Sequence, residues 1–126
     1  MQIASFYAGL CGVLFLVLSA LVIRERVKFT IYLGDGDREH ARRLIRVHGN
    51  FAEYVPLALI LLFAAETSGA PNWLIHLAGS SLVVGRVLHA LGLGRSSKWS
   101  AGRFIGTNLT FLAIGIGAVL ALRGIL

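Results

Sequence analysis

A stripe of polar side chains marks one face of the segment 39–53, which we expect to be helical. Its members are Glu39, Arg43, Arg46, Asn50 and Glu53. At about 100° per residue they fall within an arc of roughly 80° and extend over roughly 20 Å of helix, whereas His48 points elsewhere. Apolar chain continues after Glu53, so the stripe descends into a bilayer, where an uncompensated charge is costly. We therefore expect it to face other helices.

Further cations are expected beside this stripe on two later helices. Arg86 and His89 lie one turn apart and can share a face, and Arg103 and Thr107 open the last apolar block with the same spacing. Together with the stripe they predict a basic, polar pocket between helices at the cytoplasmic interface. Because its arginines outnumber its deep carboxylate, the pocket requires an anionic ligand, an anionic lipid or water.

The elements that must position these residues are apolar blocks of membrane-spanning length. Apolar residues make up 56% of the 126-residue chain, charged residues only 14%, and the mean hydropathy is +0.77. About 20 apolar residues in a helix cross a hydrocarbon core of roughly 30 Å. We predict an all-α bundle of four transmembrane helices, forming one domain over residues 1–126. The predicted spans are residues 3–23, 38–66, 72–91 and 102–122.

The first block resembles a signal peptide, but its length and the cations that follow it favour a retained signal anchor. The Gly34–Asp37 run is expected to be a solvated turn, with Asp37 capping the next helix. Pro56 cannot donate to the carbonyl of Ala52, so a kink is expected there.

The distribution of basic residues predicts the orientation. All Lys and Arg residues except Arg123 lie in or beside the first and third connections. The positive-inside rule therefore places both termini on the non-cytoplasmic side. The net charge of +6 is concentrated at the ends of apolar blocks, where basic residues meet lipid head groups. We therefore do not expect nucleic acid as a partner.

Simpler interpretations exist for each of these groups. Glu53 could form an interhelical ion pair with Arg46 or Arg86 that only fixes packing. The histidines lack a third ligand at suitable spacing, so no metal site is predicted. Cys11 is expected to act as a small buried hydrophobe. The small-residue pair Gly102 and Gly106 predicts a helix contact.

The polar segment resembles the MAPEG superfamily, the membrane-associated proteins in eicosanoid and glutathione metabolism. In that family the second helix carries Arg, Asn four residues later, Glu three beyond, often Tyr next, and Pro two after that. The matching residues here are Arg46, Asn50, Glu53, Tyr54 and Pro56. Arg43 matches a basic residue one turn earlier, Arg86 the arginine of the third helix, and Arg103 the arginine that opens the fourth. The likeness covers all four spans and is greatest to small bacterial inner-membrane members.

The resemblance implies a homotrimer in the inner membrane, with glutathione bound between subunits near the cytoplasmic face. In family terms the tripeptide would be held by Arg43, Arg46, Asn50, Glu53, Tyr54 and Arg86, and His89 would donate a hydrogen bond. Arg103 would be catalytic by stabilising the thiolate, with Arg95 and Lys98 as alternatives for that role. A lipophilic small molecule could then reach the site from the membrane lipid.

The chain departs from the family pattern at two positions. Tyrosines common in family enzymes are replaced by His89 and Leu93. Two principal hypotheses follow. The first is a glutathione-dependent transferase or peroxidase acting on lipophilic electrophiles or lipid hydroperoxides. The second is a non-catalytic protein whose basic intersubunit pocket binds anionic lipid or another anion. A transporter is a third and less favoured class, because no span is clearly broken.

Overall fold

Four helices make up nearly all of the computed structural model, which describes residues 2–124. They are α1 (Gln2–Phe29), α2 (Glu39–Thr67), α3 (Asn72–Arg95) and α4 (Ala101–Arg123). All four are long and apolar enough to cross a membrane. The predicted all-α bundle of four transmembrane helices is therefore confirmed.

Two helices extend further than the hydropathy pattern predicted. The first continues through its basic segment to Phe29 rather than ending at residue 23, and the third continues to Arg95 rather than residue 91. In α1 the added residues include Arg, Glu and Lys, which are good helix formers, so the helix projects beyond its apolar span. In α3 tertiary packing extends the helix, because Gly92 lies against the start of α4 and Leu93 is buried. The expected Asp37 cap is wrong, because Arg38 is the N-cap residue and makes no side-chain cap.

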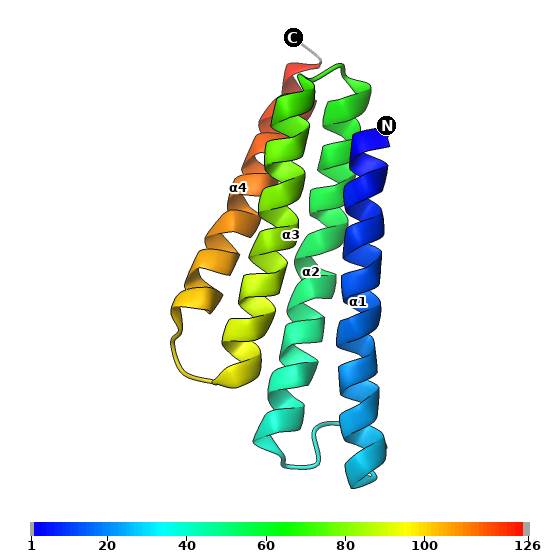
Figure 1. The fold of residues 1–126 in the computed structure, drawn as a ribbon, viewed down its shortest axis with the longest axis vertical. Coiled ribbons are helices and arrows are strands. Elements are labelled where there is room, and N and C mark those ends of the chain that lie inside the picture. The colour runs from blue at the N-terminus through cyan, green and yellow to red at the C-terminus, as the bar shows by residue number, and fades with distance from the viewer. Residues whose placement is uncertain (1, 125–126) are drawn as a thin grey trace.

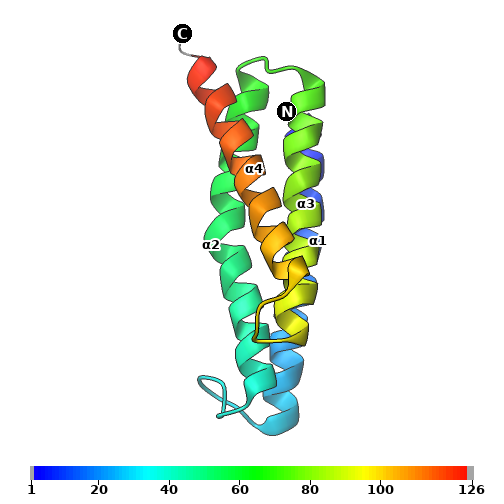
Figure 2. The same cartoon turned by 90° about the vertical axis from the view of Figure 1, so that its left-hand side faces the viewer.

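The helices form an elongated bundle in which α1 and α4 lie on opposite sides (Figure 1). The α1–α2 and α3–α4 connections lie at one end, which we call the basic end, and both termini lie at the other. A quarter turn shows α4 crossing α3 and α2 obliquely (Figure 2). Trp73 and Trp99 are exposed at opposite ends of the bundle, as aromatic residues at the two membrane interfaces are.

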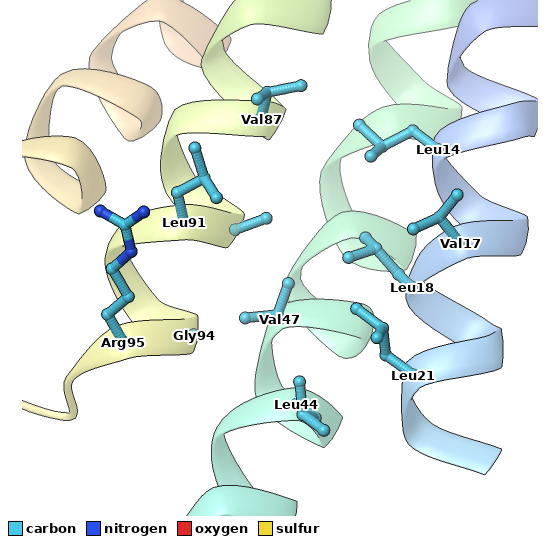
Figure 3. A pocket seen from close by; sticks show the side chains of 11 residues that line it. Leu14, Val17, Leu18, Leu21, Leu44, Val47, Val87, Leu91, Gly94 and Arg95 are labelled. Atoms are coloured by element: carbon cyan, nitrogen blue, oxygen red, sulfur yellow. The ribbon is translucent and has the colours of Figure 1, made fainter. Parts of the chain in front are cut away.

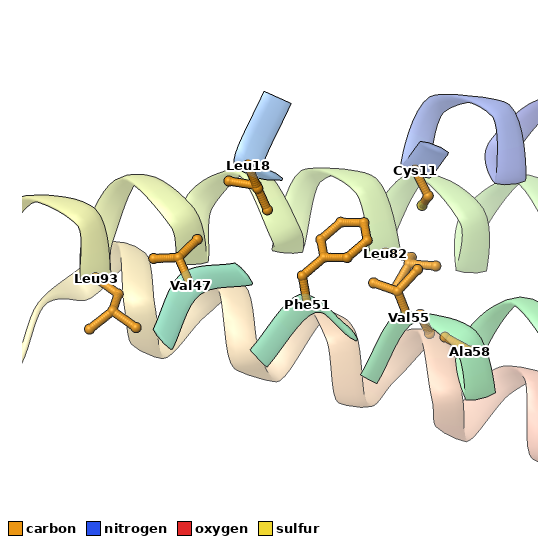
Figure 4. Packing of buried hydrophobic residues seen from close by; sticks show 9 residues of the cluster. Cys11, Leu18, Val47, Phe51, Val55, Ala58, Leu82 and Leu93 are labelled. Atoms are coloured by element: carbon orange, nitrogen blue, oxygen red, sulfur yellow. The ribbon is translucent and has the colours of Figure 1, made fainter. Parts of the chain in front are cut away.

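Apolar side chains from all four helices fill the interior. One buried cluster includes Cys11, Leu18, Phe51, Leu82 and Ala113, and part of it is drawn in Figure 4. Cys11 is only 2% exposed, which agrees with its expected role as a small hydrophobe. His48 contacts Ser19 of α1 at 3.0 Å through Nε2, so it does point away from the polar stripe.

Glycines allow α3 and α4 to pack with their backbones nearly in contact. A Cβ atom added to Gly106 would lie 2.6 Å from the backbone nitrogen of His89, and one added to Gly102 would lie 3.0 Å from the carbonyl oxygen of Leu88. The predicted helix contact of Gly102 and Gly106 is therefore confirmed. This close packing fixes the start of α4, where Arg103 lies, against the part of α3 that carries His89.

Candidate functional site

Two residues of the polar stripe, Arg46 and Glu53, lie on a face of α2 that is open within the chain. Arg46 pairs with Glu53 through two hydrogen bonds of 3.1 and 3.2 Å. Their side chains are 54% and 56% exposed. The expectation that the stripe faces other helices is therefore wrong for this pair within one chain. Two oppositely charged groups are left on an open face of α2, each able to exchange its partner for a ligand.

Asn50, another residue of the stripe, contacts a buried arginine of α3. Arg86 is 2% exposed, and its Nη1 atom donates a hydrogen bond of 2.6 Å to Oδ1 of Asn50. Its guanidinium carbon also lies 5.8 Å from the ring centroid of Tyr54. Within residues 2–124 its buried Nε atom has no hydrogen-bond partner. The cation is thus held by an amide and an aromatic face, and no carboxylate of the described chain neutralises it.

His89 lies one turn from Arg86 and is also buried, at 4% exposure. Its backbone nitrogen and Cβ atom pack against Gly106 of α4. The two ring nitrogens can donate or accept hydrogen bonds.

Arg103 is positioned by the first turn of α4. The Ser100 side chain caps this helix by accepting a hydrogen bond from the Arg103 backbone, and the Arg103 guanidinium donates to the carbonyl of Ser97 at 3.5 Å. Its side chain lines a pocket of about 480 Å³ on the outer face of α4. The lining comprises Trp99, Ser100, Arg103, Phe104, Thr107, Asn108 and Phe111.

This pocket adjoins the α2 stripe through an aromatic contact. The rings of Phe111 and Tyr54 have centroids 5.8 Å apart. A mainly apolar surface beside a cation therefore borders the polar face that carries Arg46 and Glu53. Phe111 and Asn108 did not emerge from the sequence as site residues. The available signal for Phe111 was its spacing of four residues from Thr107 and eight from Arg103 along one helical face.

Arg43 is separated from this arrangement by its own contacts. It pairs with Glu39 at 2.9 Å and donates to the carbonyl of Gly94 at 3.3 Å. Glu39 in turn accepts a hydrogen bond of 2.9 Å from Ser97. Arg43 and Glu39, at the start of α2, thus link this helix to the end of α3 and to the α3–α4 connection. Their role is structural.

The site lacks a phenol at both positions where the sequence departs from the expected pattern. Leu93 is buried in the apolar cluster with Val47 and Phe51, so it faces the core. His89 is the polar group that stands beside Arg86. Among the described residues no group of three His, Cys, Asp or Glu side chains comes together to hold a metal ion.

The sequence of the whole bundle matches the MAPEG family model over residues 4–123. The chain belongs to the MAPEG family. It is 33% identical over 114 residues to the inner membrane protein YecN of Escherichia coli K12, with 90% of this chain and 85% of the relative covered. The YecN protein of the uropathogenic strain CFT073 matches to the same extent.

In this MAPEG protein the sequence-predicted site residues fall into two groups. In the first group Asn50 and Tyr54 contact Arg86, and Arg46 pairs with Glu53 on the open face of α2. This group comprises Arg46, Asn50, Glu53, Tyr54, Arg86, His89 and Arg103. Arg43 lies apart, held by Glu39 and Gly94. The first group presents separate cations, one carboxylate and a bordering apolar pocket, which together suit a zwitterionic ligand with a net negative charge.

Proposed function

We propose that this MAPEG protein binds glutathione and conjugates its thiolate to lipophilic electrophiles or uses it to reduce lipid hydroperoxides. The observation that carries the proposal is the buried Arg86, which reaches the stripe through Asn50 at 2.6 Å while its Nε atom is unpartnered within residues 2–124. A buried guanidinium without a carboxylate favours an anionic ligand at the same place.

The charges of the site complement those of glutathione. The tripeptide carries two carboxylates and one ammonium group at neutral pH. Arg46 and Arg86 supply cations for the carboxylates, and Glu53 supplies an anion for the ammonium. The ion pair between Arg46 and Glu53 is on the open face of α2. Each of the two side chains can therefore leave the other and bind a ligand group without disturbing the bundle.

Arg103 supports the chemical step. A cation next to a thiol stabilises the thiolate, which is the nucleophile. In conjugation the thiolate sulfur would bond to an electrophilic carbon as the bond to a leaving group breaks, and the leaving group would depart with its electron pair. In peroxide reduction it would attack the terminal oxygen and break the O–O bond, giving glutathione sulfenic acid and an alkoxide that takes up a proton to become the alcohol. A second glutathione would then convert the sulfenic acid into the disulfide and water. The α4 pocket beside Arg103, lined by Trp99, Phe104 and Phe111, suits an apolar acceptor arriving from the membrane.

We further propose an inner-membrane location with both termini outside the cytoplasm and a homotrimeric assembly. The printed names of the relatives support the membrane, and the cations at the basic end support the orientation. An exposed ion pair at the depth of Arg46 and Glu53 favours a covering neighbour, because charges facing lipid are costly. A second subunit would provide that cover and complete the site.

Calorimetric titration of glutathione into the detergent-purified protein tests this function. We expect binding by the intact protein and a loss of at least about tenfold in affinity for Arg46→Ala and Glu53→Ala. Arg123→Ala is the matched control, because this cation lies at the opposite end. Turnover of a chromogenic thiol acceptor should then depend on Arg103. A glutathione-loaded, folded trimer without turnover would contradict the enzymatic part.

A second candidate is a non-catalytic protein that binds an anion in the same pocket. Burial of Leu93 in the core favours it, because this position then supplies no phenol to bond the sulfur. In that case wild-type protein would bind glutathione or an anionic lipid, and Arg103→Ala would leave all measured turnover unchanged. Turnover that falls on Arg103→Ala but not on Lys98→Ala would exclude this candidate.

A further inference from the structure

The helices α1 and α3 touch at one end of the bundle and separate toward the other. Near the termini, the Tyr7 hydroxyl contacts Nδ1 of His76 at 3.0 Å, and Gly79 leaves room for the Tyr7 ring. Toward the basic end the two helices no longer meet, and α2 forms the floor between them (Figure 1). The separation opens a groove on a face of the bundle.

This groove has a volume of about 280 Å³ and an almost wholly aliphatic lining. Figure 3 shows Leu14, Val17, Leu18 and Leu21 on one side, Val87 and Leu91 on the other, and Leu44 and Val47 between them. From Leu14 to Leu21 it extends for about 10 Å along the helix axis. The groove shares no residue with the glutathione site and reaches the basic end at Gly94 and Arg95.

Two properties of the groove indicate what occupies it. Its rim is open, since Val17 is 50% and Leu91 49% exposed. Because both residues lie on membrane-spanning helices, the groove opens toward the lipid. Its basic end carries Arg95, which is exposed and forms no hydrogen bond or ion pair within the described residues 2–124. Arg43 is close by, because it bonds the carbonyl of Gly94. The groove therefore combines an apolar trough with a positive mouth.

We propose that this groove is a binding site for an anionic phospholipid of the leaflet at the basic end. One acyl chain lies along the leucines and valines of α1, α2 and α3, and the phosphate pairs with Arg95. A lipid fits the groove because its aliphatic lining gives a chain contact surface but no polar partner. Arg95, the cation at the mouth without a partner in the described residues, favours anionic over zwitterionic head groups.

Gly94 offers a direct way to close the groove. A Cβ atom at this position would meet nothing within 4 Å, and Gly94 lines the groove. A phenylalanine there therefore meets no clash at its Cβ atom, and its ring can fill the acyl-chain volume. Val17→Trp blocks the same space from α1, so the result does not depend on one variant folding. Gly115→Phe is the matched control, because it also faces open space, on α4.

The experiment is native mass spectrometry of delipidated, purified protein titrated separately with phosphatidylglycerol and phosphatidylcholine. We expect the intact protein to retain phosphatidylglycerol about fivefold more strongly. Gly94→Phe and Val17→Trp should lose most binding of both lipids, while Gly115→Phe retains it. Arg95→Gln should lose the preference for phosphatidylglycerol but keep phosphatidylcholine binding, and Lys98→Gln should keep the preference.

Three results would overturn the proposal. Equal lipid retention by Gly94→Phe, Val17→Trp and the intact protein would show that lipid binds elsewhere. A preference that survives Arg95→Gln would remove the proposed head-group contact. A change in subunit number for Gly94→Phe and Val17→Trp, but not for Gly115→Phe, would show that a second copy covers the groove. Glutathione binding is measured on the same samples and is expected to be unchanged in Gly94→Phe, so the two sites are tested independently.

Discussion

Arg86 on α3 and Asn50 on α2 are joined by a hydrogen bond of 2.6 Å between Nη1 and Oδ1. The amide satisfies one donor of the guanidinium but contributes no negative charge. A buried cation normally pairs with an anion, because removal from water is otherwise costly. Arg86 is thus an unneutralised charge within the described chain, and the ligand-free bundle accommodates it at the expense of stability.

Replacing Arg86 with methionine should therefore stabilise the ligand-free protein while removing glutathione binding. Methionine has similar length and packs flexibly, and exchanging buried charge for apolar volume often raises stability by roughly 1 kcal/mol or more. Thermal unfolding in one fixed detergent, without glutathione, measures the first effect, and calorimetry measures the second. A lower unfolding temperature in Arg86→Met would show that the cation supports the fold itself.

Replacing Glu53, which pairs with Arg46, should weaken glutathione binding without changing the stability of the ligand-free protein. Both side chains are more than half exposed and pair mainly with each other. Glutamine at position 53 can still accept a hydrogen bond from Arg46, so Glu53→Gln should change the unfolding temperature little. Affinity for glutathione should fall about tenfold, because the ligand ammonium loses its carboxylate. Melting curves and titrations on the same preparation separate these effects. Asp37→Asn serves as the control, because Asp37 is an exposed residue of the α1–α2 connection and asparagine tolerates its positive φ of 58°.

Much of the fold could be predicted because spans of the required length are visible as apolar blocks. The helix ends could not be predicted. Charged residues after Ile23 continue α1 into water as readily as they end a span, and after Leu91 the burial of Leu93 and the packing of Gly92 on α4 extend α3. The helical period correctly placed Asn50 and Glu53 on one face. It could not show that Asn50 bonds Arg86 of α3 whereas Glu53 bonds Arg46 of its own helix. That difference depends on how the neighbouring helices pack.

The α4 pocket and the groove could not be predicted from the sequence for a similar reason. Phe111 is one apolar residue among many in its span, and only packing places its ring beside Tyr54. The groove arises from the divergence of α1 and α3 past Gly79, which no local pattern records. A small residue such as Gly79 indicates close approach, but the sequence does not identify the partner helix or the side chain that fills the space.

The contact between α3 and α4 makes Gly106 sensitive to the smallest addition. A Cβ atom there would lie 2.5 Å from the carbonyl oxygen of Gly85 and 2.6 Å from the His89 nitrogen. Because these are backbone atoms, the helices must separate, and Gly106→Ala should destabilise the protein by ~1–3 kcal/mol. Gly115→Ala meets nothing within 4 Å and should be neutral or slightly stabilising. Equal unfolding temperatures for the two variants would contradict the packing described here.

Restoring a tyrosine at Leu93 should not restore a missing active-site phenol. Leu93 is 6% exposed and packs in the core with Val47 and Phe51. A larger side chain would overpack this interior and cost ~1–3 kcal/mol. We expect Leu93→Tyr to lower the unfolding temperature and to leave turnover of a thiol acceptor no higher than in the parent protein. Val84→Tyr on the exposed face of the same helix is the stability control, and increased turnover in Leu93→Tyr would place that side chain in the site.

The loop before α2 should respond to acid through Asp35. Its carboxylate accepts a hydrogen bond of 2.6 Å from Arg42 and another of 2.9 Å from the backbone of Asp37. These contacts, led by the Arg42 hydrogen bond, hold the pKa of Asp35 below its usual value. A lowered folded-state pKa means that the stabilisation is complete above the ordinary aspartate pKa of about 3.9 and is lost as the pH falls through the folded-state value.

Hydrogen exchange and carboxyl NMR in micelles can follow this transition. The backbone amide of Asp37 should be protected at neutral pH and lose protection in acid, in step with protonation of Asp35. Arg42→Gln should move the Asp35 pKa up toward its ordinary value. Arg38→Gln should not, because Arg38 pairs with Glu25 at 3.4 Å. If Asp35 titrated at its ordinary value in the intact protein, the Arg42 contact would not form in solution.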